Sequence, residues 1–98
     1  MHHEIEITRN GDQVRLPNPM PEMHVHDTVH YRFRNGLVKI DFAGRSPFDK
    51  DVITSKNGPM ELMRPGNFNC HCTITPEGEK DIGWPGDSEA GGDHVIHP

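Results

Sequence analysis

The chain has 98 residues, of which 32% are hydrophobic, and a formal net charge of −5 with its eight histidines counted as neutral. This length predicts a single domain, 1–98, because compact domains commonly have about this size. The ten Lys and Arg residues are scattered along the sequence, which excludes the basic patch that nucleic-acid binding requires.

Two further classes of segment are missing from the sequence. No run of about 18 apolar residues occurs, so no membrane span is predicted. The start, Met1-His2-His3-Glu4, lacks the apolar stretch of a secretory signal, which favours the cytoplasm. A periplasmic or secreted location is expected instead if the sequence is a trimmed mature form.

The first predicted element is a β-hairpin over residues 4–16. Apolar and polar residues alternate on both sides of Asn10-Gly11, a dipeptide typical of two-residue type I′ turns. This turn predicts that Ile7 faces Val14 across the hairpin.

A second predicted hairpin covers residues 29–42 and provides the best core face of the sequence. Its apolar residues alternate at matching spacing on both sides of Asn35-Gly36. A two-residue turn there predicts that Tyr31 faces Ile40, on a surface that points into the core.

The remaining elements are shorter. Three prolines make residues 17–21 an extended linker. Further strands are predicted at residues 52–55, 60–64, 67–75 and 94–97. Between the last two, Pro76 to Gly92 is rich in Gly, Pro and acidic residues, which predicts a long surface loop.

Four segments follow one another in an informative order. They are His26-Asp27-Thr28-Val29-His30-Tyr31, Val38-Lys39-Ile40-Asp41-Phe42, Pro65-Gly66-Asn67-Phe68-Asn69-Cys70-His71-Cys72 and Gly91-Gly92-Asp93-His94-Val95-Ile96. Together they resemble the strands of cupredoxin-like domains, small Greek-key sandwiches related to blue-copper proteins. The resemblance implies an all-β, Greek-key β-sandwich from about Val25 to Ile96, with an Ig-like sandwich as the alternative.

The resemblance does not extend to a copper site. A blue-copper centre needs two histidines, a thiolate and usually a weak axial methionine. Cys72 matches the family's cysteine, but Val38 stands where the first histidine belongs, and no His or Met occurs between Cys72 and His94. Ser46-Pro47-Phe48 resembles an element of small bacterial members that lack the copper ligands.

Cys70-His71-Cys72 is the most obvious place for chemistry. In a regular strand both thiols point to one face and His71 to the other, so one reading is that the cysteines are small core residues. The alternative is a copper, zinc or redox site in which Cys70, Cys72 and His94 come together.

Two other histidine patterns allow metal binding. His24, His26 and His30 have even spacing, which places them on one side of a strand, either as a surface metal site or as a solvated face. His3, with a free amino terminus and two deprotonated amides, either provides a square-planar site for Cu(II) or Ni(II) or occurs at this position by chance.

No motif of an enzyme active site is present, so we expect a non-catalytic binding or interaction module without a cofactor. It would present the Pro76 to Gly92 loop and a sheet edge to an unidentified protein partner or to a second copy of the chain. Trp84 would either cover the core or anchor that partner. The alternative function is a metal-binding or redox protein that uses Cys70, Cys72 and His94.

Overall fold

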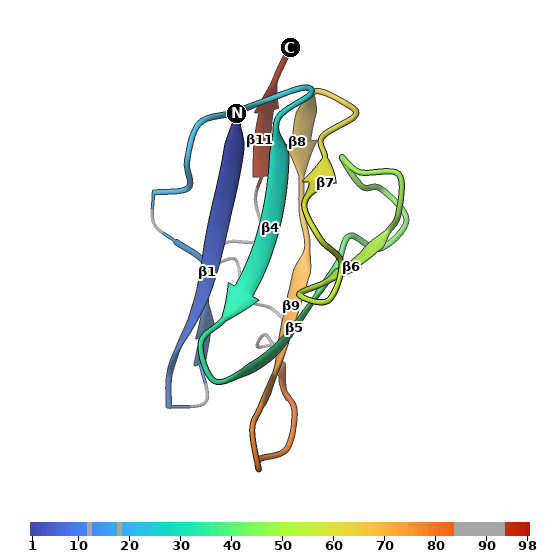
Figure 1. The fold of residues 1–98 in the computed structure, drawn as a ribbon. Helices are drawn as coiled ribbons and strands as arrows, with labels where there is room; N and C mark the ends of the chain where they lie inside the picture. The colour runs from blue at the N-terminus through green and yellow to red at the C-terminus, as the bar shows by residue number, and fades with distance from the viewer. Residues whose placement is uncertain (12, 18, 84–93) are drawn as a thin grey trace.

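The computed structural model describes residues 1–11, 13–17, 19–83 and 94–98, and in this part the chain is all-β (Figure 1). The strands in chain order are β1 (His2–Asn10), β2 (Gln13–Arg15), β3 (Met23–His24), β4 (Thr28–Phe33), β5 (Gly36–Asp41), β6 (Val52–Thr54), β7 (Met60–Glu61), β8 (Gly66–Phe68), β9 (His71–Pro76), β10 (Ile82–Gly83) and β11 (His94–His97). Within these residues there is no helix with the length and hydropathy that crossing a membrane would need.

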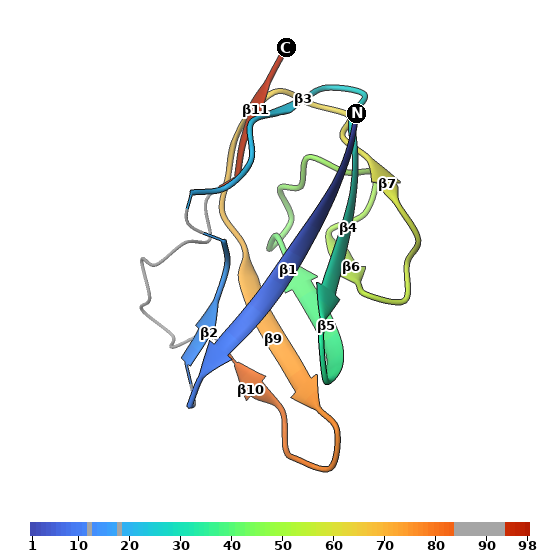
Figure 2. The same ribbon diagram turned by 60° about the vertical axis from the view of Figure 1, so that its left-hand side comes forward.

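The strands form two sheets. The larger, mixed sheet has the order β10-β9-β5-β4-β1-β2, with β6 paired to β5 and β7 paired to β4. Its end strands β10 and β2 contact each other, so the sheet curls into a nearly closed barrel (Figure 2). The smaller sheet has the order β3-β11-β8. The all-β prediction is thereby confirmed, whereas the Greek-key order of cupredoxin-like domains stays a prediction.

The first hairpin forms, but with a register two residues away from the predicted one. Arg9 faces Val14 and Asn10 faces Gln13, so the turn starts at Gly11, which has a φ of 61°. A shift of two residues keeps every side chain on its face. The apolar residues of both strands are therefore buried as predicted.

The second hairpin departs further from its prediction. Phe33 pairs with Gly36, so the turn lies one residue earlier than the Asn35-Gly36 turn expected, and the strands then separate. Strand β4 pairs with β1 and β7, while β5 pairs with β9 and β6. The predicted facing of Tyr31 and Ile40 as ladder neighbours is wrong, although both side chains are fully buried in the interior.

Gly36 explains why the hairpin opens. A Cβ atom at this position would overlap the carbonyl oxygen of Thr75, so the missing side chain allows β9 to approach β5 closely. The Glu77 N–H donates a hydrogen bond to the Asn35 carbonyl at 2.8 Å, which fixes the adjoining turn. Glycine is therefore required at position 36 for the contact between strands, and not for the positive φ of a type I′ turn.

Toward the C-terminus, the predicted strand at residues 67–75 is two strands, β8 and β9, interrupted at residues 69 and 70. The predicted loop contains the short strand β10, since Ile82 pairs with Ile74 of β9. The part of that loop after residue 83 lies outside the described residues. Strand β11 forms as expected, between β3 and β8.

The interior joins both sheets into one core. Its buried apolar residues are Ile5, Ile7, Val14, Leu16, Met23, Val29, Tyr31, Val38, Ile40, Phe42, Phe48, Ile53, Leu62, Phe68, Cys70, Cys72, Ile74 and Ile96. Burial of a Val, Leu, Ile, Phe or Met side chain contributes about 1.5–3 kcal/mol. This core fixes the positions of β1, β3, β4 and β11, which carry polar side chains on their outer faces.

Candidate functional site

The residues of the predicted metal or redox site lie in the interior. Cys70, Cys72 and His94 are 7%, 1% and 0% exposed. The Nε2 atom of His94 is joined to the hydroxyl of Tyr31 by a hydrogen bond of 2.8 Å. The imidazole also packs against the ring of Phe42, with 5.3 Å between centroids. This burial agrees with the interpretation of the two cysteines as small core residues.

Burial favours the neutral forms of Cys72 and Tyr31 in this interior. Burial, and secondarily the neighbouring Cys70, raise the pKa of Cys72 to about 12. Burial and the same two cysteines raise the pKa of Tyr31 well above its ordinary value. A thiolate is the form that binds metals and attacks electrophiles, and at neutral pH Cys72 is a thiol.

No group of three or more His, Cys, Asp or Glu side chains in the described part of the chain is arranged to hold a metal ion. The structure therefore gives no support to a metal site at Cys70, Cys72 and His94. His71 is exposed on β9, away from the two buried cysteines, as the alternation of the strand predicts.

Six of the eight histidines lie on β1, β3, β4 and β11 or in the turn between β3 and β4, near the N-terminal end of β1. We call this region the histidine end. Its members are His2, His3, His24, His26, His30 and His97. Each of the six lies beside a carboxylate or another imidazole of the region.

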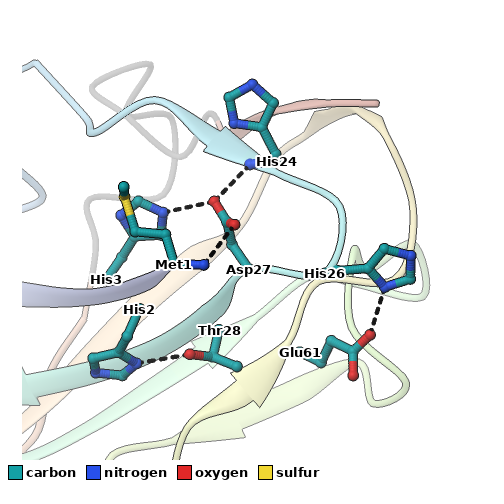
Figure 3. Close-up of polar contacts among 8 residues, drawn as sticks. All are labelled: Met1, His2, His3, His24, His26, Asp27, Thr28 and Glu61. Carbon is teal, nitrogen blue, oxygen red and sulfur yellow. Dashed lines mark hydrogen bonds and ion pairs between the residues drawn. The ribbon is translucent and has the colours of Figure 1, made fainter.

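Asp27 is the centre of the histidine end (Figure 3). Its Oδ1 accepts a hydrogen bond from the amino group of Met1 at 3.1 Å. Its Oδ2 accepts one from Nε2 of His3 at 2.9 Å and one from the backbone N–H of His24 at 3.0 Å. These donors, His3 first and His24 second, hold the pKa of Asp27 well below its ordinary value. The carboxylate thus ties β1 to the turn that leads into β4.

Glu4 connects two histidines across the parallel β1–β4 pair. It accepts hydrogen bonds from Nε2 of His2 at 3.0 Å and from Nδ1 of His30 at 2.9 Å. Nε2 of His30 donates to the carbonyl of Ser55 at 3.1 Å. Because both partners of His30 are acceptors, its doubly protonated ring satisfies them best. Glu4 accordingly raises the pKa of His30, and the two histidines lower the pKa of Glu4.

His26 occupies a strained position in the turn between β3 and β4. The Asp27 N–H donates to the His24 carbonyl at 3.0 Å, which makes His26 the third residue of a four-residue turn with a φ of 78°. This left-handed region favours glycine. The imidazole of His26 points outward, 2.8 Å from Glu61 (Figure 3).

The predicted surface site of His24, His26 and His30 does not form as one group. The left-handed turn at residue 26 breaks the strand periodicity that would have aligned the three. His30 and His26 have separate carboxylate partners, and His24 packs instead against His97 of β11. The pairing of His24 with His97 depends on strand order and has no signal in the sequence.

A second surface feature is an open cleft of about 460 Å³ between the middle of β1 and the C-terminal end of β4. Glu6, Arg32, Phe33 and Arg34 line it, and we call it the arginine cleft. Glu6 and Arg32 are partners across the parallel pair, with 3.7 Å between Arg32 Nη2 and Glu6 Oε1. The signal in the sequence is the run Arg32-Phe33-Arg34 directly before Asn35-Gly36, which carries two cations around one aromatic residue.

The predicted partner anchor, Trp84, lies outside the described residues. The same is true of the acidic and glycine-rich stretch that follows it, up to residue 93. Comparisons with protein-family models, with curated proteins and with solved structures found no match to the chain. Its function is therefore inferred from its own residues.

Proposed function

We propose that this chain is a non-catalytic binding module that contacts an acidic segment of a protein partner at the arginine cleft. The observation that carries the proposal is the composition of this cleft. Arg32 and Arg34 line an open depression together with the partly buried Phe33. Arginine and aromatic residues dominate the energetics of protein interfaces.

The charges of the cleft favour carboxylates as ligands. A guanidinium group binds a carboxylate through two parallel hydrogen bonds. The side chains of Arg32 and Glu6 are 57% and 45% exposed, so their ion pair contributes only about 0.2–1 kcal/mol. A carboxylate of the partner can therefore replace Glu6 beside Arg32 at small cost. Arg34, at the exposed turn between β4 and β5, supplies the second cation.

The interior supports a binding role over a catalytic one. All buried side-chain nitrogen and oxygen atoms of the described residues have hydrogen-bond partners, as expected where polar groups serve packing. Cys72 is protonated at neutral pH because burial raises its pKa to about 12. The alternative metal or redox function at Cys70, Cys72 and His94 would require a thiolate at this place, so we favour the binding role.

A cupredoxin-like origin of the scaffold belongs to the same proposal. The described parts of the segments that carry the resemblance include β4, β5, β8 with β9, and β11, and their succession along the chain is the one that the resemblance implies. Retention of the strands together with loss of the copper ligands fits a scaffold that now binds through its surface.

The proposal is tested by titrating the protein with short synthetic peptides while its backbone amides are followed by NMR. Peptides rich in Asp and Glu are compared with Lys-rich peptides of equal length. We expect the acidic peptides to shift the amides of Glu6, Arg32, Phe33 and Arg34, although the chain itself carries a net charge of −5. Binding should weaken as salt is added, because the charges are exposed.

Three variants sharpen this test. Arg34→Glu should abolish binding of the acidic peptides, whereas Lys50→Glu, the same charge change at an exposed position on another loop, should leave binding almost unchanged. Glu6→Gln should strengthen binding because it removes the competing carboxylate. Equal binding of acidic and basic peptides, or equal losses in the Arg34 and Lys50 variants, would contradict the proposal. Shifts that appear in the absence of peptide as the protein is concentrated would instead indicate self-association.

A further inference from the structure

We propose that His24 and His97 form a surface binding site for a divalent transition-metal ion of the zinc class, with Glu22 as a third ligand. The two histidines come from opposite ends of the chain and are register partners in the parallel pair of β3 and β11. Neighbouring strands lie about 4.8 Å apart. The two side chains therefore leave the sheet side by side.

The alternation of the strands directs both imidazoles outward. Met23 and Ile96, which precede them and are register partners of each other, are 0% and 2% exposed. Because successive residues of a strand point to opposite faces, His24 and His97 must face solvent. Both are exposed, so a metal ion can reach them directly.

The separation of the two rings matches a shared ion. Their centroids are 5.3 Å apart and their planes are inclined by 41°. On one tetrahedral ion with metal–nitrogen bonds of about 2.1 Å, two imidazole centroids lie roughly 5 Å apart. The pair therefore needs little movement to place one nitrogen of each ring on the same ion.

Glu22 provides the third ligand. Its Oε1 lies 3.9 Å from Nε2 of His97, and its side chain is 75% exposed. Rotation of this carboxylate would bring it onto an ion held by the two imidazoles, and water would complete a tetrahedral sphere. No preformed group of three ligands exists in the described residues, so the site consists of a fixed pair and one mobile side chain.

The backbone around the pair is held before any ion binds. The Val25 N–H donates to the His97 carbonyl at 2.9 Å, and the His24 N–H donates to Asp27 Oδ2 at 3.0 Å. These bonds fix the main chain at both ligands, which lowers the ordering cost of binding. Among the ring contacts of the described residues, the one between His24 and His97 brings two imidazoles together.

The test is a calorimetric titration of tag-free protein with zinc chloride. Zinc is chosen because it does not require the square-planar, amide-bound geometry that an amino-terminal histidine motif offers to Cu(II) or Ni(II). We expect one zinc ion per chain. Imidazole carbon resonances of His24 and His97 should shift together during the titration, and those of exposed His71 should not.

Substitutions then assign the site. His24→Gln and His97→Gln should each weaken zinc binding about tenfold or more, Glu22→Gln should weaken it less, and His71→Gln should leave it unchanged. Thermal unfolding checks that each variant folds, which we expect because all four side chains are exposed. Zinc binding that survives in the folded His24→Gln/His97→Gln double variant, or that is lost equally in His71→Gln, would overturn the proposal.

Discussion

The interior around Tyr31 and the histidine end are built from similar polar residues but treat charge in opposite ways. In the interior, His94 is fully buried and bonded to Tyr31. At the histidine end, His26 is 80% exposed and lies beside a carboxylate. This difference shows that burial, and not residue type, decides whether a histidine or cysteine of this chain packs in the core or can bind a ligand.

The titration of the two regions follows the same division. Burial suppresses charge in the interior, where the pKa of Cys72 rises to about 12. Hydrogen bonds between histidines and carboxylates favour charge at the other region, where the pKa of Asp27 falls and that of His30 rises. The interior is thereby set for stability, and the histidine end for response to ions and pH.

The largest expected effect is the low reactivity of the thiols in the interior. Because the pKa of Cys72 is about 12 instead of the ordinary value of 9.0, its thiolate is about a thousandfold scarcer in the native protein than in the unfolded chain. Alkylation at neutral pH, followed by mass spectrometry of the peptides, should be slower by about this factor without denaturant. Native labelling of Cys72 within tenfold of the unfolded rate would mean that the interior is open.

A smaller effect is expected when a histidine is replaced in each region. His94→Leu leaves the buried Tyr31 hydroxyl without this partner and should cost about 1–3 kcal/mol in denaturant unfolding. His2→Leu, at a half-exposed position, should stay within about 0.5 kcal/mol.

A double variant sharpens this comparison. Tyr31→Phe together with His94→Leu replaces both partners by apolar groups, so its loss of stability should be smaller than the sum of the two single losses. Strict additivity would show that the Tyr31–His94 hydrogen bond does not couple the two residues.

The smallest effect concerns the pH dependence of the histidine end. Glu4 and the Ser55 carbonyl favour protonated His30 and raise its pKa, against burial of the ring and the charge of Arg32. The raised pKa of His30 means that its contribution is complete below about pH 6.5 and is lost as the pH rises through the folded value. The lowered pKa of Glu4 removes the contribution again as the pH falls below its ordinary value of 4.5.

His30→Gln should therefore destabilise the chain by about 0.2–1 kcal/mol near pH 6 and by less near pH 8. Urea unfolding at both pH values measures this difference, with His71→Gln as the exposed control that should show no such trend. A penalty for His30→Gln that grows with pH would contradict the assigned sign.

Some features of the fold could be read from local patterns, and others could not. Alternation placed Tyr31 and Ile40 in the core, and both are buried. The prediction that these two residues face each other was wrong. Gly36 allows β9 to approach β5 closely, and this contact between distant segments cannot be inferred from turn preferences.

The candidate sites show the same limit. The alternation of β9 predicted two cysteines on one face with His71 on the other, and both cysteines are buried while His71 is exposed. The even spacing of His24, His26 and His30 suggested one surface group, but the left-handed turn at His26 separates them.

Alternation along the chain fixed the buried faces of the main strands, because a period of two is set by the geometry of the extended backbone. Which strands lie together was settled by the folded arrangement of the chain. Pairing depends on contacts between distant segments, so the parallel neighbours β1 with β4 and β3 with β11, and with them the arginine cleft and the His24–His97 pair, arise only when the chain folds.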